Sequence, residues 1–502
     1  MSTRTLPGLA SACSSNIVRA RLAEIDSETK ALQARLAVLA RERRPIADAL
    51  RGIVYPGVVD LPPEITAEIF LHYVVYGEIG GTDPKTIGWT PLSSCSPLVL
   101  ASTCRTWREI ALSLPSIWSN VNIVAQGNAV GSAEKLLERW FPRASSHPLT
   151  VSFHRGDNSL LKSLIPVLPR LQSFMCWVPV QTPFPDDLFR GCLPSLRSLS
   201  ISSDSQDGAD ATNALVAFAD APQLREVCLS QFPLLSIQLP WEQLTQLALD
   251  TVYIDECLVV LRQTIALETL SVAQISEPDE FPVMADIRLA YLHTLTVFSP
   301  QYPRHLLSHL ILPVLTHIEF PLPAPDIFAP EARSARTCFT SLVERSACAL
   351  RSIKFVEPSV TATIACLRTA GPTVSTIHLE DVDWTVHGLT DLLHALRDDS
   401  ESGFVPQLTS LSLTPFRSAV EVPYAELAEV LALRAGKLDT FELVLGPTRF
   451  SFEDPPPSVN DLDDALYRLR ELEARGMKLN IRSVQKLSEK VDCIAVAHPR
   501  WK

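Results

Sequence analysis

The feature that most constrains the fold is a short apolar pattern that recurs eleven times between residues 171 and 443. Each copy has an apolar residue, two variable residues, a second apolar residue, one variable residue and a third apolar residue, as in PSLRSLSI, AYLHTLTV and PQLTSLSL. The copies follow one another at intervals of 20 to 35 residues. They begin at Leu171, Leu196, Leu224, Leu244, Leu267, Leu292, Leu315, Leu350, Val374, Leu408 and Leu438.

This pattern predicts one short strand in every repeat. Alternation of apolar and variable residues is typical of a strand with one buried face, and LxxLxL at this period is typical of leucine-rich repeats. We therefore expect an α/β chain with an irregular leucine-rich-repeat solenoid over 130–450, whose strands form a parallel sheet. The segments TNALVAFAD, DECLVVLRQTI, TDLLHALRD and YAELAEVLALRAG are predicted to return as helices along the outer side.

The last part of the chain is predicted to close this solenoid. An acidic, proline-rich break, FEDPPPSVNDLDD, is followed by a helical segment, DALYRLRELEARG, and a strand-like segment, MKLNIRSV. A stack of repeats exposes its core at an open end unless a different unit covers it. We therefore assign 451–502 to the break and a C-terminal cap.

Composition and charge narrow the class of protein. With 502 residues and 46% hydrophobic residues the chain can bury a large core. A net charge of −12 argues against nucleic-acid binding, which depends chiefly on Lys and Arg. The eleven cysteines include no CxxC pair, which fits reduced thiols in the cytoplasm or nucleus. No apolar run is long enough for a membrane span, and the first residues lack the apolar core of a signal peptide.

A heptad pattern marks the N-terminal region. Residues 1–16 are small and polar and are expected to be disordered. From residue 17 to 51 we predict a helix, in which Pro45 ends or kinks the helix. Its apolar seam is Val18, Leu22, Ile25, Thr29, Leu32, Leu36 and Leu39. Two interpretations remain open, namely a coiled coil through which the protein self-associates and a helix that folds back on its own chain.

A second helical region, 57–122, precedes the repeats. In LPPEITAEIF, two prolines can begin a helix, and Ile65, Ile69 and Phe70 recur at helical spacing. A loop rich in glycine and proline separates this helix from a second one, predicted over Leu98 to Leu114. The region has more apolar surface than about 50 residues bury alone, so part of that surface is expected to contact a partner.

LPPEITAEIF followed by LASTCRTWREIA resembles the F-box, the adaptor-binding module of Skp–cullin–F-box ubiquitin ligases. The tail SLPSIWSNVNI resembles the variant of this module in large protein families of mushroom-type fungi. The resemblance covers about 60 of 502 residues. The segment from Gly77 to Ser96 is longer than the compact F-box has at that place, which leaves the relative placement of the two helices open.

The resemblance implies a substrate-recognition subunit with a Skp-type adaptor and a cullin ligase core as partners, without enzymatic activity, cofactor or metal of its own. The residues that it assigns to adaptor binding, or to holding the module together, are Leu61, Pro62, Ile65, Ile69, Phe70, Leu100 and Trp107. By periodicity alone these residues form only an apolar stripe. The identity of the target protein is not encoded in any motif of the sequence.

Target binding is expected on the variable positions of the strands, which should face solvent on the concave side. The positions selected for target binding are Trp177, Arg197, Arg225, His293, Phe298, His317, Arg351, Lys354 and His378. The same side also receives Glu226, Asp250, Glu268, Glu319, Glu380, Asp439 and Glu442. These side chains include both signs of charge, which suggests a protein partner rather than a polyanion.

Motifs for bond chemistry are absent from the sequence. There is no phosphate-binding loop, zinc helix or nucleophile elbow. His305 and His309 have the i, i+4 spacing of two metal ligands, but ordinary histidines are the favoured interpretation. Cys104 is interpreted as a packed thiol. Two rival functions remain, an adaptor-independent scaffold and, less favoured, an enzyme whose site is assembled from distant residues.

Overall fold

The computed structural model describes all eleven predicted repeats and most of the remaining chain. The described residues are 12–52, 61–79, 96–123, 130–153, 158–178, 184–203, 214–276, 285–298, 303–322, 331–382, 388–397, 403–415, 423–445, 459–486 and 489–492.

One sheet of fifteen strands extends through the described chain. Its strands are β1 (Asn120–Ile123), β2 (Leu149–Phe153), β3 (Leu171–Trp177), β4 (Ser198–Ser202), β5 (Glu226–Ser230), β6 (Gln246–Asp250), β8 (Thr269–Val272), β11 (Thr294–Val297), β13 (His317–Pro321), β14 (Ser352–Val356), β15 (Thr376–Val382), β16 (Ser410–Pro415), β17 (Thr440–Leu445), β18 (Lys478–Lys486) and β19 (Glu489–Asp492). Neighbouring strands follow chain order and are parallel, except that β19 is antiparallel to β18. The predicted parallel sheet is therefore confirmed.

Two pairs of short strands lie outside this sheet. β7 (Val252–Tyr253) pairs with β9 (Ile275–Ser276), and β10 (Ile287–Arg288) pairs with β12 (Leu310–Ile311), both in parallel. The large sheet also exceeds its predicted limits. It begins with β1, inside the region assigned to the helical module, and it continues through β18 and β19, inside the region assigned to the cap.

The eleven apolar repeats coincide with eleven consecutive strands of the sheet, from β3 to β17. The first apolar residue of every repeat is at most 3% exposed. In neighbouring strands the later apolar positions are also in register, so that Ile353 lies beside Ile377 and Phe355 beside Leu379. Each such side chain contributes about 1.5–3 kcal/mol by its burial. Stacking of these columns holds one repeat against the next.

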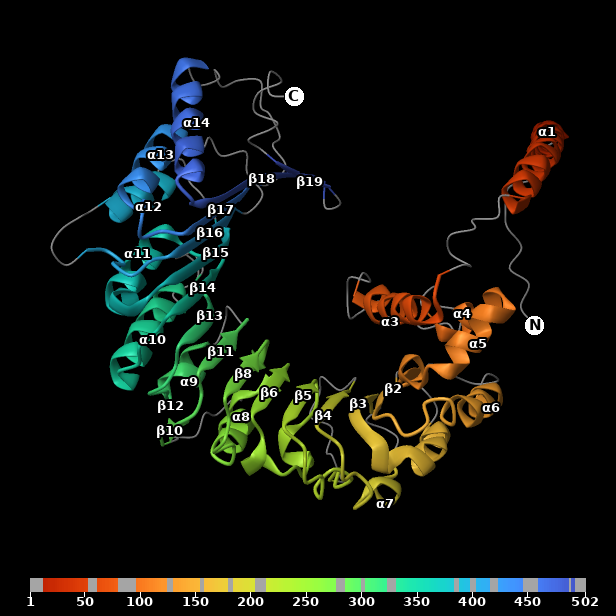
Figure 1. Cartoon of the computed structure of the whole chain (residues 1–502), viewed down its shortest axis with the longest axis horizontal. Helices are drawn as coiled ribbons and strands as arrows, with labels where there is room; N and C mark the ends of the chain where they lie inside the picture. Colours follow the sequence, from red (N-terminus) through yellow and green to blue (C-terminus); the bar gives the residue numbers. More distant parts are fainter. Residues whose placement is uncertain are drawn as a thin grey trace.

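Figure 1 shows the strands along the inner side of an arc and the helices along its outer side. The outer helices are α6 (Val130–Trp140), α7 (Asp186–Phe189), α8 (Ile254–Leu261), α9 (Pro303–Ser308), α10 (Glu331–Ser346), α11 (Val360–Ala370), α12 (Gly388–Arg397), α13 (Tyr424–Leu433) and α14 (Val459–Ala474). The 3-10 helices among them are η3 (Asn158–Arg170), η4 (Leu234–Ser236), η5 (Trp241–Gln243) and η6 (Gly371–Thr373). In the described residues, no helix combines the length and the apolar character that crossing a membrane requires.

One predicted outer helix is wrong. Within TNALVAFAD the described residues form a β-bridge and a turn instead of a helix. The backbone amides of Val216 and Ala217 donate to the Asp186 carboxylate at 3.1 and 2.8 Å, and the amide of Leu215 donates to the carbonyl of Ser236 at 2.7 Å. These backbone amides therefore donate to other segments and not to carbonyls of a helical turn, so no helix forms here.

The N-terminal helix α1 (Ala12–Gly52) is longer than predicted. It includes residues 12–16, which the sequence assigned to a disordered segment, and residues 1–11 lie outside the described chain. It also continues through Pro45, so of the two effects expected of this proline, an end or a kink, the end does not occur. Pro45 removes one backbone donor from the helix. The turns on both sides of it contain good helix formers such as Arg and Ala, which favour continuation of the helix.

Trp118 joins the helical region to the sheet. Its buried indole donates from Nε1 to the carbonyl of Ala111 at 2.8 Å, while its own carbonyl accepts from Nε1 of Trp140 in α6 at 2.9 Å. The two indole rings meet edge to face with centroids 4.9 Å apart. The guanidinium of Arg143 lies over the Trp118 ring at 4.5 Å. A single side chain thus binds elements before and after the first strand.

We predict that Trp118→Ala destabilises the protein. The change removes a fully buried ring and leaves the Ala111 carbonyl without its donor, so the free energy of unfolding should fall by about 3–5 kcal/mol. Urea unfolding followed by circular dichroism measures this. The matched control is Tyr291→Ala, because Tyr291 is 64% exposed. Its effect should stay within about 0.5 kcal/mol, and equal effects of the two variants would contradict the central role of Trp118.

Candidate protein-binding surfaces

The helical module contains α3 (Pro63–Ile79), α4 (Pro97–Thr103) and α5 (Arg105–Ser113), followed by the 3-10 turn η1 (Pro115–Trp118). Helix α3 begins at a proline, as the sequence predicts. The loop between α3 and α4, residues 80–95, lies outside the described chain, so the predicted insertion there is not described.

The prediction of a single helix over Leu98 to Leu114 is wrong, because the helix is interrupted at Cys104. This residue is extended, with φ −150° and ψ 174°, and its Sγ accepts the amide of Trp107 at 3.4 Å as the cap of α5. The end of α4 is satisfied by Arg108, whose Nε donates to the carbonyl of Ala101 at 2.7 Å. The thiol of Cys104 is therefore a capping group, and the break turns α5 away from the axis of α4.

The interior of the module is built around Phe70 and Trp107. Their rings meet edge to face with centroids 5.1 Å apart, which ties α3 to α5. Phe70 and Leu100 are buried, with exposed fractions of 1% and 4%. We therefore correct their assignment to adaptor binding, since side chains that fill the module's own core present no surface to a partner. The half-buried Trp107 acts chiefly as the link between the helices.

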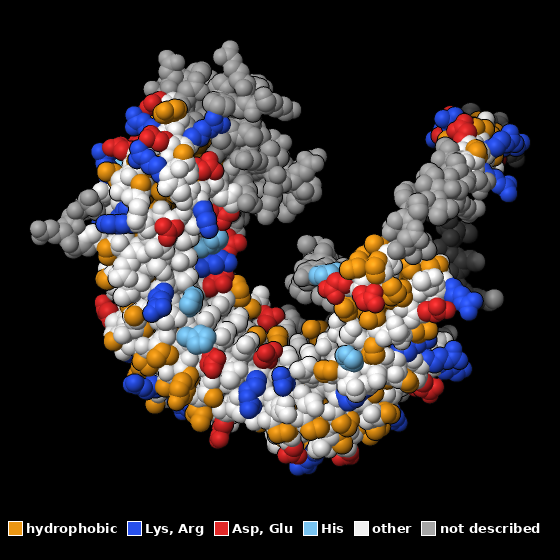
Figure 2. Space-filling view, viewed as in Figure 1, with side chains coloured by type: hydrophobic (Ala, Val, Ile, Leu, Met, Phe, Trp, Pro, Cys, Tyr) orange, Lys and Arg blue, Asp and Glu red, His pale blue; other side chains and the backbone are white. Residues whose placement is uncertain are grey.

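An apolar patch remains exposed on α3. Ile65 and Ile69 are one helical turn apart and are 50% and 47% exposed, and Pro62 beside them is also exposed. We call these three residues the α3 patch. Figure 2 shows hydrophobic side chains gathered over this part of the molecule, with acidic side chains and a histidine next to them. Leu61, the remaining predicted contact, is half-buried at the start of the helix.

The second candidate surface is the inner face of the sheet. Side chains alternate along each strand, so the buried leucines point to the outer helices and the residues between them point inward. His317, Lys354 and His378 lie on this inner face, and Trp177 and Phe298 lie on it near the carboxyl ends of their strands. These five residues therefore lie on the concave side of the sheet, as the sequence predicts.

The other four predicted target contacts lie at the edge of the sheet. Arg197, Arg225, His293 and Arg351 each precede a strand by one residue, and their backbone groups bond to the neighbouring repeats. All four are exposed. Their placement on the concave face is corrected accordingly, because the strand pairing begins one residue later. They form a polar border along the amino ends of the strands.

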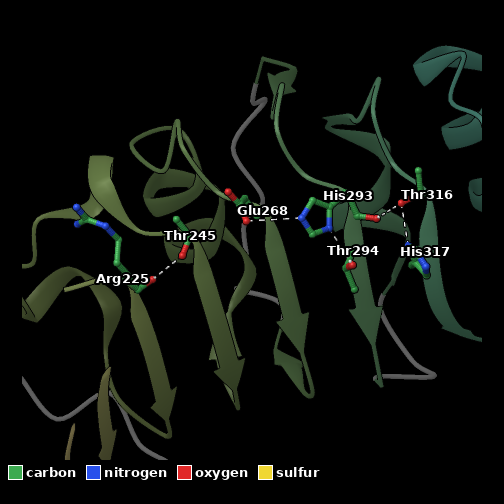
Figure 3. Close-up of polar contacts among 7 residues, drawn as sticks. All are labelled: Arg225, Thr245, Glu268, His293, Thr294, Thr316 and His317. Carbon is green, nitrogen blue, oxygen red and sulfur yellow. Dashed lines mark hydrogen bonds and ion pairs between the residues drawn. The ribbon is translucent and has the colours of Figure 1, made fainter. Parts of the chain in front are cut away.

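Figure 3 shows how part of this border is connected. Nε2 of His293 lies 3.6 Å from the Glu268 carboxylate, and Nδ1 lies 3.1 Å from Oγ1 of Thr294. The Thr316 hydroxyl donates to the carbonyl of His293 at 3.1 Å and lies 2.8 Å from Nδ1 of His317. These contacts link Glu268, His293 and Thr316, which belong to three neighbouring repeats.

The inner face has a charged cluster at its centre. Nζ of Lys354 donates to the Glu319 and Glu380 carboxylates at 2.8 and 2.6 Å, across strands β13, β14 and β15. Farther along, the Glu442 carboxylate accepts from Ser412 at 3.3 Å and from Asn480 at 2.8 Å. We call Glu319, Lys354, His378, Glu380 and Glu442 the central cluster. It contains three carboxylates and one lysine, so it attracts positive charge.

Two pKa shifts follow from this arrangement. Burial lowers the pKa of Lys354, but the hydrogen bonds to Glu319 and Glu380 outweigh it and raise the pKa overall. Burial is also the main cause that lowers the pKa of His378. The carboxylates of the cluster raise this pKa, and the positive charge of Lys354 lowers it further. His378 is therefore neutral at pH 7.

The sequence did not single out every member of this surface. Ser412 and Asn480, which orient Glu442, were missed. Ser412 occupies the same strand position as Lys354 and His378, so the register of the repeats could have identified it. Asn480 belongs to the segment assigned to the cap, and only the pairing of β18 with β17 brings it to this face.

Three buried cysteines lie outside these two surfaces. Burial raises the pKa of Cys257 and Cys366 to about 12 and also raises the pKa of Cys176, so these thiols are poor nucleophiles. His305 lies in α9 and His309 just after it. Within the described ranges, no group of three histidine, cysteine or carboxylate side chains is arranged to hold a metal ion.

Comparisons with known proteins found no family model and no curated protein sequence that matches this chain.

We predict that Lys354→Met raises the pKa of His378. The substitution removes the cation that lowers this pKa and leaves the carboxylates that raise it. A pH titration of the histidine ring signals by NMR measures the shift, with His378→Gln used to assign the signal. An unchanged pKa would show that Lys354 does not act on His378.

The lowered pKa of His378 also predicts a dependence of stability on pH. Because the unfolded chain binds this proton more tightly than the folded chain, the free energy of unfolding should fall as the pH decreases from about 6.5 through the lower folded pKa. His378→Gln should lack this part of the loss. Urea unfolding at pH 7.5 and pH 5.5 tests this, and identical pH dependence in both proteins would contradict it.

Proposed function

We propose that the protein is a substrate-recognition subunit of a Skp–cullin–F-box ubiquitin ligase. The observation that carries the proposal is the exposed pair Ile65 and Ile69 within LPPEITAEIF, the segment that resembles the adaptor-binding part of the F-box. A monomeric protein gains nothing from two large apolar side chains on one turn in water. Their burial against a Skp-type adaptor would contribute about 25 cal/mol for each Å² of apolar surface removed from water.

The sheet would hold the target protein as an irregular leucine-rich-repeat solenoid. Consecutive parallel strands, stacked leucines and returning outer segments support this classification. The inner face and its border offer hydrogen-bonding and charged groups at regular spacing, together with the exposed Phe298. Such a mixed surface suits a folded protein or an extended peptide segment as the partner.

The protein would contribute proximity rather than bond chemistry. Trp118 is hydrogen-bonded to α5 and to α6, and α5 packs on α3 through Trp107 and Phe70. An adaptor bound at one end and a target bound on the inner face would then keep a defined separation. This raises the effective concentration of target lysines near the ubiquitin-conjugating enzyme, which a flexible connection would do less well.

The rival function is an adaptor-independent scaffold that uses α1 and the inner face. The exposed apolar stripe of α1 favours it, because a scaffold needs a means of assembly. The two functions differ in what the α3 patch binds. In a scaffold, charges introduced into this patch leave every interaction of the protein unchanged.

We predict that Ile65→Asp, Ile69→Asp abolishes adaptor binding. Each carboxylate would have to be buried without a partner in an apolar interface, so the affinity for a recombinant fungal Skp-type adaptor should fall at least about 100-fold. Isothermal titration calorimetry measures it. The matched control is Ile265→Asp, Leu433→Asp, two exposed apolar residues away from the module.

The result supports the proposal if the wild type and the control bind the adaptor while the α3 variant, with an unchanged circular dichroism spectrum, does not. If the wild type does not bind the adaptor, the ligase proposal is overturned. Equal loss in the α3 variant and the control would also overturn it, because the α3 patch would then have no special role.

A further inference from the structure

Helix α1 carries an apolar stripe whose described side chains are exposed. The five large residues of its seam, Leu22, Ile25, Leu32, Leu36 and Leu39, are between 45% and 66% exposed. Every other described side chain of this helix, over residues 20–39 and 41–45, is exposed as well. Among these described side chains of α1, none is buried as in a helix that folds back on its own chain.

The one polar residue of the seam is compatible with burial. The Thr29 hydroxyl donates to the carbonyl of Ile25, one turn earlier, at 2.8 Å. Its donor is thus satisfied inside the helix, and a second helix could cover it without leaving an unpaired group. The stripe from Leu22 to Leu39 is therefore a continuous surface for another helix.

The charges beside the stripe indicate which helix this is. The residues immediately before every second position of the seam, extended to Arg43, are Arg21, Glu28, Arg35 and Glu42, so the sign alternates along one flank. Two such flanks match when the helices run in opposite directions. Arg21 then faces Glu42 of the other helix, and Glu28 faces Arg35, which gives four opposite-charge pairs by symmetry.

We propose that α1 forms an antiparallel coiled coil with α1 of a second copy of this chain. In this alignment Leu22 packs beside Leu39 of the second copy, Ile25 beside Leu36, and Thr29 beside Leu32. Leu22, Ile25, Leu36 and Leu39 each gain an apolar neighbour, and Leu32 packs against Thr29. Arg21 exchanges its exposed pairing with Glu24 of its own helix, at 2.5 Å, for Glu42 of the second copy.

A parallel pair is less favourable on the same residues. It would match Arg21 with Asp26 only, and the other flanking positions would face Gln or Ala. It would also place Arg43, which continues the seam, directly opposite Arg43 of the second copy. Like charges at a seam position destabilise the pair, whereas the antiparallel alignment separates them.

The antiparallel arrangement leaves room for the rest of both molecules. With about 1.5 Å of rise per residue, the two chains leave the helix pair at Gly52 on opposite ends, roughly 65 Å apart. Each copy therefore keeps its inner face and its α3 patch accessible. The pairing does not rest on the proposed ligase function, and it holds equally for a scaffold.

The test uses two charge variants of the full chain. In the first, Arg21→Glu and Arg35→Glu make the flank uniformly negative. In the second, Glu28→Arg and Glu42→Arg make it uniformly positive. Analytical ultracentrifugation should find the wild type dimeric, and each variant alone should dimerise about 50-fold more weakly or worse, because four attractive pairs become repulsive.

Mixing the two variants should restore the dimer, since every pair is then again of opposite charge. The matched control for the apolar seam is Ser27→Asp, Ala34→Asp on the outer face, which should stay dimeric while Leu32→Asp, Leu36→Asp becomes monomeric. The proposal is overturned if the wild type is monomeric, if the positive variant alone dimerises like the wild type, as a parallel pair would, or if mixing restores nothing. Adaptor binding, measured separately, does not affect this result.

Discussion

The buried indole of Trp118 is the contact on which the arrangement of the two surfaces depends. Its Nε1 donates to the carbonyl of Ala111 before it, and the ring contacts both Trp140 and Arg143. The backbone carbonyl of the same residue accepts from Nε1 of Trp140. Because α5 packs on α3 through Trp107 and Phe70, Trp118 links the module that carries the α3 patch to α6.

The repeat pattern predicted the sheet well because a single physical rule governs it. The sheet buries one of its two faces, and residues such as Leu350 and Leu411 point to that face. A shift of the strand register by one position would turn every apolar side chain of that strand toward water. The outer segments were less predictable. The turn that begins at Ala217 depends on a carboxylate, Asp186, about thirty residues earlier in the chain, and no local pattern reveals such a partner.

The candidate surfaces were predicted in part for a similar reason. Helical periodicity identified the stripe with Ile65, Ile69 and Phe70, but it does not say which side of that stripe the module covers. The answer depends on Trp107, and therefore on the break at Cys104 that directs α5 toward α3. In the sheet, the border residues differ from the inner residues by a single position at the start of each strand. Only the hydrogen-bond register distinguishes them.

The last strand of the sheet affects how separate molecules meet. A parallel sheet that ended at β18 would present unpaired backbone amides and carbonyls, to which a strand of another molecule could add. Instead β19 turns back on β18, and three of its four residues, Glu489, Lys490 and Asp492, are charged. Charged edges oppose end-to-end polymerisation. The charges of β19 therefore disfavour the addition of another molecule's strand at this end of the sheet.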